Sequence, residues 1–224
     1  MLSYPSIKNV FKRDPIHFRI MEGQYSEPEF EQYKDAVWVF TEKVDGINVR
    51  FVSQPDNKLI EITGRNTYDS LPHPIRSQLQ LIGSMLHNEV APIVRQELSL
   101  VNSPVAFYGE GFGLGIQKAG KGYKKHQSFI LFDIWTPNGY LSKPTISKCV
   151  GGFEIQTVPI VTLGVLELGI ELVTQGLTSR IAEEDPTMLA EGLVASLQEE
   201  KTNPWGGRVI TKIKTRDFYK GDKV

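Results

Sequence analysis

Short apolar runs that do not alternate strictly with helices are the feature that most restricts how this chain can fold. Each run is rich in Val, Ile or Phe, or alternates apolar with polar residues, as buried and half-buried β-strands do. The last two runs are separated by a turn containing Pro and Gly, TNPWGG. The predicted strands are residues 36–40, 46–53, 58–63, 105–109, 128–135, 192–197 and 208–214.

Helical spacing of apolar residues is clear in only one segment. In residues 75–99 apolar side chains recur every three or four positions, although Pro92 should kink or break this helix. Residues 143–150 and 166–182 are further helix candidates. Many strands, few helices and no regular strand–helix alternation predict an α+β fold with largely antiparallel sheets.

The composition is that of an ordinary globular protein. The 224 residues suit one large domain or two small lobes, and they are 40% hydrophobic and 23% charged, with a net charge of −1. A protein that held long nucleic acid by bulk charge would be more basic, so any nucleic-acid contact must be local. The single cysteine, Cys149, excludes an internal disulfide and is expected to be an inert core thiol.

The sequence shows no membrane or export signal. No apolar run reaches the ~18 residues needed to span a bilayer. The N-terminus, MLSYPSIKNVFKRDP, lacks the apolar core of a signal peptide. We therefore predict a cytoplasmic or nuclear protein that is not secreted and has no membrane partner.

One lysine stands between two predicted strands, where a turn residue would be ordinary. In TEKVDGINVRF, residues 41–51, Lys43 is either a solvated hairpin residue or a nucleophile. A free lysine has a pKa of about 10.4, and lowering it to about 7 costs roughly 4.6 kcal/mol. Neighbouring cations and partial burial are the usual means, because both disfavour the ammonium form. A reactive Lys43 therefore requires other positive groups nearby.

Two lysines near the end of the chain are candidates for those groups. Lys212 and Lys214 are two residues apart, so on a strand both point to one face while Ile213 points to the core. The alternative is the solvated face of an edge strand. Glu110 and Glu191 each mark a predicted strand end next to a glycine. They are either structural acids or a pair that binds a ribose hydroxyl and a divalent cation.

A glycine-rich segment, GEGFGLGIQKAGKGYKK, covers residues 109–125 and has too many glycines for regular structure. It is either a flexible, solvated loop or a mobile basic flap over phosphates. Its positive charges are Lys118, Lys121, Lys124 and Lys125.

Five short motifs occur in an order that is more specific than any one of them. They are KVDG, FYGEGFG, FILFDIW, EGLVAS and KIK, and with their flanking residues they cover about residues 36–218. This ordered set resembles that of the covalent nucleotidyltransferases, which include polynucleotide ligases and mRNA capping enzymes. Within them, KVDGINVRF looks most like the ATP-dependent RNA ligases of the RNA-ligase-2 type, which favour an Asn five residues after the lysine, as Asn48 is here. The resemblance implies the nucleotidyltransferase (ATP-grasp-like) fold, with a nucleotide cleft between antiparallel sheets flanked by helices.

The resemblance also implies a three-step reaction. The lysine of the first motif, here Lys43, would attack the α-phosphate of ATP in the presence of Mg²⁺ or Mn²⁺ and form lysyl-Nζ–AMP. The AMP would pass to an RNA 5′-phosphate, and a 3′-hydroxyl would then attack the adenylate and join the strands. Phosphoryl transfer of this kind depends on positioning and on neutralising charge. An RNA-repair enzyme whose partners are RNA ends is the expectation.

The same resemblance implies roles for further residues. Lys212 and Lys214 would contact the α-phosphate and depress the pKa of Lys43. Glu191 would place the divalent metal, and Glu110 would hydrogen-bond the ribose. Phe132 would stack on adenine, with a plain core residue as the alternative. The residues implied to be catalytic are Lys43, Lys212 and Lys214.

The remaining implied roles concern the adenine edge and the RNA end. Glu42 would reach the adenine edge. Arg65 would handle a phosphate or the RNA end, and Asn48 would support the joining steps. Asp45 and Asp133 would support other residues rather than bind directly. The implied ATP-binding set is Glu42, Asn48, Arg65, Glu110, Phe132, Glu191, Lys212 and Lys214, and the implied RNA-binding set is Arg65, Lys118, Lys121, Lys124 and Lys125, with residues 208–223 as a second basic stretch.

The sequence departs from its relatives after Lys214, because only ten residues follow. We expect a single nucleotidyltransferase (adenylyltransferase) domain over residues 1–224, without a C-terminal OB-fold or helical domain. Self-adenylylation should survive, while sealing should be slow, restricted, or dependent on an accessory protein that supplies substrate grip. Two alternatives remain open. One is a DNA ligase core or a GTP-dependent mRNA capping guanylyltransferase, and the other is a non-catalytic nucleotide- or RNA-binding domain.

Overall fold

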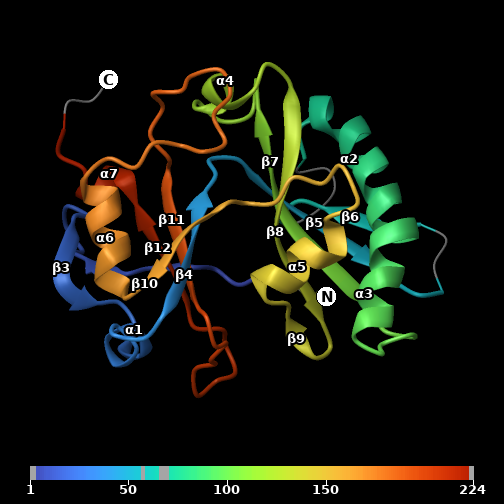
Figure 1. Ribbon diagram of the computed structural model, residues 1–224. Coiled ribbons are helices and arrows are strands. Elements are labelled where there is room, and N and C mark those ends of the chain that lie inside the picture. Colours follow the sequence, from blue (N-terminus) through green and yellow to red (C-terminus); the bar gives the residue numbers. More distant parts are fainter. Residues whose placement is uncertain (1–3, 57–58, 66–70, 222–224) are drawn as a thin grey trace. The chain divides into compact units, whose positions relative to one another are not determined.

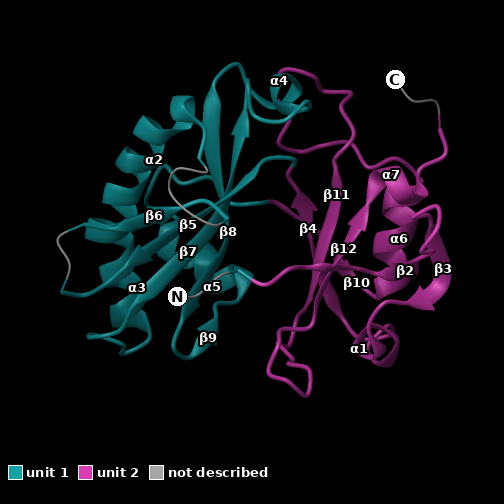
Figure 2. Cartoon of the chain, turned by 180° about the vertical axis from the view of Figure 1, so that it is seen from behind, with its two compact units in different colours: residues 1–4, 45–158 teal, residues 5–44, 159–224 magenta. Residues whose placement is uncertain are grey.

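The computed structural model describes residues 4–56, 59–65 and 71–221, and the chain divides into two compact units. Unit 1 comprises residues 1–4 and 45–158, and unit 2 comprises residues 5–44 and 159–224 (Figure 2). The boundary falls between Val44 and Asp45, inside the KVDG motif. The lysine of this motif therefore belongs to unit 2, and its aspartate and glycine belong to unit 1.

Unit 1 is built on an antiparallel sheet with the strand order β6-β5-β7-β8-β9 (Figure 1). Its strands are β5 (Ile47–Ser53), β6 (Glu61–Thr63), β7 (Val105–Gly113), β8 (Gln127–Thr136) and β9 (Gly139–Tyr140). Its helices are α2 (His73–Met85), the π-helical turn η2 (Leu86–Val90), α3 (Ala91–Glu97), α4 (Gly120–Tyr123) and α5 (Lys143–Val150).

Helices cover one face of this sheet and form the larger core of unit 1. Phe51 of β5 and Phe107 of β7 are fully buried in this core, together with Leu79 of α2, Val94 of α3 and Ile146 of α5. Alternate residues along each strand point to this face, as the two-residue period of a strand requires. The residues between them therefore point to the opposite face.

The opposite face of the unit 1 sheet carries a smaller cluster, which we call the aromatic face. It consists of Tyr4, Val52, Ala106, Tyr108, Phe132, Trp135 and Tyr140. The ring centroid of Tyr4 lies 5.0 Å from that of Tyr108 and 5.0 Å from that of Phe132. The hydroxyl of Tyr4 also donates to the carboxylate of Asp133 at 2.5 Å. Tyr4 is thereby held on this face by packing and by a hydrogen bond.

The helix predicted for residues 75–99 is present but interrupted. α2 leads into the single π-helical turn η2, which is followed directly by α3, whose first turn contains Pro92. Proline lacks the N–H that would bond to the carbonyl four residues earlier, and a wider turn lets the chain continue past it. The predicted disturbance at Pro92 is confirmed, as a π turn within a continuing helix.

Unit 2 is built on a second sheet with the strand order β1-β12-β11-β4-β10, beside a β2-β3 hairpin (Figure 1). Its strands are β1 (Lys8–Asn9), β2 (Phe11–Arg13), β3 (Ile20–Tyr25), β4 (Trp38–Lys43), β10 (Ile160–Gly164), β11 (Gly192–Leu197) and β12 (Ile210–Lys214). Its helices are α1 (Pro28–Gln32), α6 (Leu166–Thr174) and α7 (Thr215–Phe218).

The core of unit 2 lies on one face of its sheet, against α6. Trp38 and Phe40 of β4, Leu193 of β11 and Ile213 of β12 are fully buried there, and Ile170 of α6 packs with them. Because strand residues alternate between faces, odd-numbered residues of β4 and even-numbered residues of β12 point to the other face. Those residues include the lysines singled out in the sequence.

The predicted α+β class is confirmed, and both sheets are largely antiparallel. Among the pairings of the described strands, only β1 with β12 is parallel. Cys149 is buried in α5 as expected, and burial raises the pKa of its thiol. Within the described residues, no helix is both long enough and apolar enough to cross a bilayer.

Three predictions about regular structure were wrong in detail. Residues 109–113 continue β7 instead of forming a loop, so Glu110 lies inside a strand and not at its end. The helix predicted for residues 166–182 ends at Thr174, because Gly176 adopts a φ of +88°, a left-handed conformation that ends helices. The strands and helix of residues 8–32 were not predicted at all.

Candidate functional site

Two lysines contact a single carboxylate at one end of the unit 2 sheet. The Nζ of Lys43 lies 2.6 Å from one carboxylate oxygen of Glu191, and the Nζ of Lys214 lies 2.7 Å from the other. The side chains of Lys43 and Lys214 are 22% and 16% exposed. Lys43 is therefore not a solvated hairpin residue. It is a partly buried group, bridged through Glu191 to a lysine of the last strand.

Strand register explains how Glu191 reaches both lysines. Gly192, the first residue of β11, pairs with Lys43 on one side and with Lys214 on the other. Its φ is +151°, and a Cβ here would lie 2.0 Å from the carbonyl oxygen of Ile213. Only glycine fits such a position. The Glu-Gly pair of EGLVAS thus starts the strand with a carboxylate beside both lysines and no side chain between them.

Lys212 adds a third positive charge on the same face. Ile213 between Lys212 and Lys214 is fully buried, so the two lysines share the face away from the core, as predicted. Burial lowers the pKa of Lys212, and the charges of Lys214 and Lys43 lower it further, against the opposing effect of Glu191. The positive charges of Lys43, Lys212 and Lys214 are therefore close enough to one another to lower the pKa of Lys212.

Glu191 is held in its charged form by its two lysine partners. Burial by itself raises the pKa of this carboxyl. The charge of Lys43 and the hydrogen bonds from Lys214 and Lys43 outweigh burial, so the pKa of Glu191 lies below its usual range. An ionised carboxylate is what a divalent cation requires.

Glu42 lies next to Lys43 in sequence but points to the opposite face of β4. Its side chain is 2% exposed, and its carboxylate accepts hydrogen bonds from the hydroxyl of Ser179 at 2.5 Å and the backbone N–H of Arg180 at 2.8 Å. Burial raises its pKa, although these two hydrogen bonds oppose the shift. Glu42 thus fixes the chain at residues 179–180 to the strand that carries the nucleophile candidate.

In unit 1, two of the predicted residues are direct neighbours. Asn48 of β5 and Glu110 of β7 pair across the two strands, so their side chains share a face. Tyr108 lies two residues before Glu110 on the same strand, so the two side chains point to the same face. Since Tyr108 belongs to the aromatic face, Asn48 and Glu110 lie on that face as well. Gly46 of KVDG explains the close approach of the strands, because a Cβ there would lie 2.3 Å from the carbonyl oxygen of Gly111.

Phe132 lies at an irregularity in the same sheet. Tyr108 of β7 pairs with Asp133, but the next residue, Gly109, pairs with Leu131, which makes Phe132 the extra residue of a β-bulge. Its ring is partly exposed and belongs to the aromatic face. Bulges often redirect a side chain next to an active site. This geometry allows Phe132 to offer a ring surface, while it remains packed against the cluster.

Asp133 is a buried residue whose contacts hold its neighbour Phe132 in place, and its supporting role in the site stays a prediction. It is 1% exposed, and its carboxylate accepts hydrogen bonds from the Tyr4 hydroxyl and from the Nζ of Lys143 at 2.8 Å. Lys143 also donates to the backbone carbonyl of Phe132. The bulged residue is therefore fixed from both sides, by Tyr4 on its ring and by Lys143 on its carbonyl.

The predicted basic loop is fastened to the KVDG motif within unit 1. The Nε2 of Gln117 donates to the carbonyl of Gly46 at 3.3 Å, and the hydroxyl of Tyr123 accepts from the N–H of Asp45 at 3.1 Å. No sequence signal indicated these contacts. They hold α4 and its neighbouring lysines beside the motif, with Lys118, Lys121 and Lys125 exposed and Lys124 placed 5.9 Å from the ring centroid of Phe112.

The other candidates are less organised. Arg65 is exposed two residues after the end of β6, and residues 66–70 that follow it lie outside the described residues. Arg13 was not predicted, yet its Nη2 lies 2.5 Å from Asp217 in α7, three residues after Lys214. Its charge is also one of the factors that lower the pKa of Lys212. No local motif could have found this pair, because its members lie at opposite ends of the chain.

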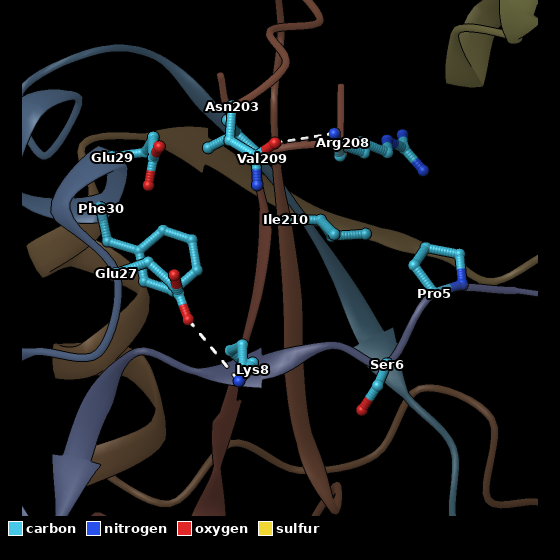
Figure 3. A pocket seen from close by; sticks show the side chains of 11 residues that line it. Pro5, Ser6, Lys8, Glu27, Glu29, Phe30, Asn203, Arg208, Val209 and Ile210 are labelled. Carbon is cyan, nitrogen blue, oxygen red and sulfur yellow. Dashed lines mark hydrogen bonds and ion pairs between the residues drawn. The ribbon is translucent and has the colours of Figure 1, made fainter. Parts of the chain in front are cut away.

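A cavity of about 190 Å³ in unit 2 is not the candidate site (Figure 3). Lys8 and Glu27 form an ion pair of 3.7 Å in its wall, and Phe30 supplies apolar surface. None of the predicted catalytic or ATP-binding residues lines it, although Arg208, Val209 and Ile210 from the start of the predicted basic stretch 208–223 do. Its volume is below the range of about 300–1,000 Å³ that is typical of ligand sites.

The sequence matches the RNA ligase family over residues 36–214, a span that contains all five motifs, with KIK at its very end. The chain belongs to the RNA ligase family. Family membership accounts for the order of the motifs and for the lysines gathered on unit 2. Among curated proteins, no match to this RNA ligase family member was found.

Solved structures of Naegleria gruberi RNA ligase have a similar fold. An alanine variant crystallised with ATP and Mn has a TM-score of 0.63, 21% identity and coverage of 96% of this chain and 56% of that chain. The structure with PPi has a TM-score of 0.62 with the same identity and coverage. Another variant, with AMP and Mn, has a TM-score of 0.62 and 20% identity, and the coverage is again 96% and 56%. This family member thus spans a little over half the length of these structural relatives.

Proposed function

We propose that this member of the RNA ligase family is an ATP-dependent RNA ligase that acts through a covalent adenylate on Lys43. One observation carries the proposal: Lys43 is partly buried beside Lys212 and Lys214, with Glu191 bridging two of the three. A solvated lysine or a simple binding surface would not need this arrangement. The motif order and the family match support the same conclusion.

In the first step the Nζ of Lys43 attacks the α-phosphorus of ATP. A phosphorus–nitrogen bond forms, the bond to the β-phosphate oxygen breaks, and pyrophosphate leaves while the amine loses its protons to water. AMP then passes to an RNA 5′-phosphate, and an RNA 3′-hydroxyl displaces AMP to form the phosphodiester. Lys212 and Lys214 neutralise charge on the α-phosphate oxygens, which is the main demand of phosphoryl transfer.

Glu191 is the residue we propose for a divalent cation. The described residues contain no cluster of three or more His, Cys, Asp or Glu side chains that could hold a metal. Mg²⁺ does not need one, because it is often bound by one or two carboxylates together with substrate phosphates. The ionised Glu191 carboxylate fits that donor set, and a cation bound there would stabilise negative charge on the phosphates.

The predicted nucleoside contacts remain proposals for the aromatic face of unit 1. Glu110 is the proposed ribose ligand and Phe132 the proposed adenine-stacking ring, on a face that also carries Asn48. Asn48 and Arg65 are proposed to act after adenylate formation, at the RNA end. Glu42 is proposed to act indirectly, since its carboxylate already binds residues 179–180.

RNA ends are the proposed partners, and the lysines near α4 are the proposed backbone contacts. Lys118, Lys121 and Lys125 are exposed beside the KVDG motif, which supports this role. An accessory protein that supplies further grip on the RNA is also proposed. The proposed location is the cytoplasm or nucleus, supported by the buried, unpaired thiol of Cys149.

Two measurements test this function. The protein is incubated with labelled ATP or labelled GTP and a divalent cation, and acid-stable label on the protein is measured. It is then offered nicked RNA or nicked DNA, and sealed product is resolved by electrophoresis. We expect label from ATP and sealing of RNA. Label from GTP, sealing of DNA alone, or no label at all would each reject the proposal in favour of a capping enzyme, a DNA ligase or a binding domain.

A further inference from the structure

The turn between β2 and β3, residues 14–19, exposes two large apolar side chains. Ile16 is 77% exposed and Phe18 is 68% exposed. Phe18 also has a φ of +56°, which is rare for a bulky residue and persists only where the surroundings impose it. Such an outlier with its ring in solvent is a reason to look for a function.

The same segment is positively charged. It carries Lys12, Arg13 and Arg19 beside one acid of its own, Asp14, within a chain whose net charge is −1, and Arg13 is paired with Asp217 of α7. The carboxylate of Asp14 is occupied by the turn itself, because it accepts three backbone N–H groups at 2.7–3.0 Å, from Ile16, His17 and Arg19. Lys12 and Arg19 are exposed, as is the ring of Phe18, and an aromatic ring among cations is the composition of a surface that binds single-stranded nucleic acid.

The turn is also rigid, which lowers the entropy cost of binding. Besides the three bonds to Asp14, the guanidinium of Arg13 donates to the carbonyl of Phe18 at 2.7 Å. The N–H of Phe18 donates to the carbonyl of Asp14 at 3.1 Å. The ring of Phe18 is therefore presented by a fixed backbone, and fewer degrees of freedom are lost when a ligand binds it.

The base of this turn is joined to the end of the strand that carries the catalytic lysines. Arg13 contacts Asp217 at 2.5 Å, and Asp217 lies in α7, which begins directly after Lys214. β1, which leads into β2, runs parallel to β12 with Asn9 opposite Lys212. Phe11 of β2 packs against Phe218 of α7, with 6.2 Å between their ring centroids, and Figure 2 draws β2 and β3 next to α6.

We propose that the β2-β3 turn binds an RNA strand next to the reacting end, with Phe18 stacked on an unpaired base and Lys12 and Arg19 against phosphates. The proposal rests on the proposed ligase function for its ligand. It names a substrate contact that none of the five motifs contains. The positive charge of the turn is complementary to RNA. The turn also belongs to unit 2, the unit that contains Lys43.

The test measures binding of a fluorescent, 5′-phosphorylated single-stranded RNA by anisotropy, over a range of salt concentrations. Phe18→Gly removes the ring, and glycine accepts the positive φ without strain, so the fold should be retained. We expect binding to weaken about 5- to 100-fold, as loss of one stacked base predicts. Phe18→Trp should bind like the wild type. Arg19→Ala should reduce the salt dependence of binding by about one phosphate contact.

Trp205 provides a matched control. It is an exposed aromatic residue, 82% exposed, in the connection between β11 and β12, at the ends of those strands away from Gly192 and Lys214. Trp205→Ala should leave RNA binding unchanged. Binding that is unaffected by Phe18→Gly, or weakened equally by Trp205→Ala, would overturn the assignment. Absence of lysyl-AMP in the wild type would instead reject the ligase function, which the binding measurement does not require.

Discussion

Lys43 and Glu191 are in direct contact, with 2.6 Å between the amine and a carboxylate oxygen. A carboxylate partner favours the ammonium form of a lysine, whereas attack on phosphorus requires the neutral amine. The pair must therefore separate before the reaction. Lys212 and Lys214 then remain as cations near Lys43, where they can meet the negative charge of the phosphates.

Replacing Lys43 should abolish covalent labelling with ATP. Lys43→Ala removes the amine, and Lys43→Arg keeps a cation that can still bind Glu191 but cannot present a neutral amine at ordinary pH. Loss of label in both variants would therefore show that Lys43 is the nucleophile and not only an ion-pair partner of Glu191. Acid-stable label is measured after incubation with labelled ATP. Lys148→Ala, a surface lysine paired with Glu97, is the control and should label normally. Residual label in either Lys43 variant would place the nucleophile elsewhere.

Replacing Glu191 by glutamine should change how stability depends on pH. The pKa of Glu191 is lowered in the folded protein, so its ion pairs stabilise the fold above the unfolded value of about 4.5 and are lost as pH falls through the folded pKa. Glu191→Gln should lower the free energy of unfolding at pH 7 and flatten its decline below about pH 4.5. Urea unfolding at several pH values measures both. Parallel curves for the two proteins would show that Glu191 is not coupled to the fold in this way.

Replacing Lys212 by methionine should stabilise the fold but impair covalent labelling with ATP. The pKa of Lys212 is lowered by burial and by its cationic neighbours, so its charged form opposes folding at pH 7. Methionine retains the chain length without the charge, and the melting temperature should rise. Labelling with ATP should fall about 100- to 1,000-fold, the usual effect of losing one group that stabilises transition-state charge. A lower melting temperature would contradict the predicted effect on stability, and normal labelling would contradict the predicted role of Lys212 in adenylate formation.

The sequence predicted the elements whose pattern is local and missed those that depend on distant partners. The alternation of Lys212, Ile213 and Lys214 was enough to place two lysines on one face. The strands of residues 8–25 are short and polar, and β1 is stabilised by pairing with β12, almost the whole chain away. Glycine content misled the prediction for residues 109–113, where Gly109 makes room for Phe129 of β8 and Gly111 for Ile75 of α2 within a strand.

The candidate site shows the same division. Motifs identified Lys43 and Glu191, because their neighbours in sequence, such as Gly192, have to fit one geometry. The contacts of Tyr4 with Phe132, and of Arg13 with Asp217, join residues more than a hundred positions apart and have no local signature. Alternation along β4 places Glu42 on the face opposite Lys43, where its partners Ser179 and Arg180 come from a distant part of the chain.

Asn48 and Arg65 should matter after the adenylate has formed. Their alanine variants are expected to take up label from ATP but to lose sealing of nicked RNA by about 100-fold or more, because they are assigned to the RNA end. Label and sealed product are measured on the same preparations. Asn102→Ala, at an exposed turn of unit 1, is the control and should do both. An equal loss at the labelling step would show that these residues serve adenylate formation instead.

Phe132 can be assigned to adenine or to the core by a pair of leucine variants. Phe132→Leu keeps an apolar group against Tyr4 but removes the ring that would stack on the base. If Phe132 binds adenine, KM for ATP in the labelling reaction should rise about 5- to 100-fold, with little change in melting temperature. Phe129→Leu is the matched control, since Phe129 lies in the helix-covered core of the same strand. It should cost roughly 1 kcal/mol of stability and leave KM for ATP unchanged. If Phe132→Leu behaves like Phe129→Leu, Phe132 is a packing residue, and the adenine must be held by another group.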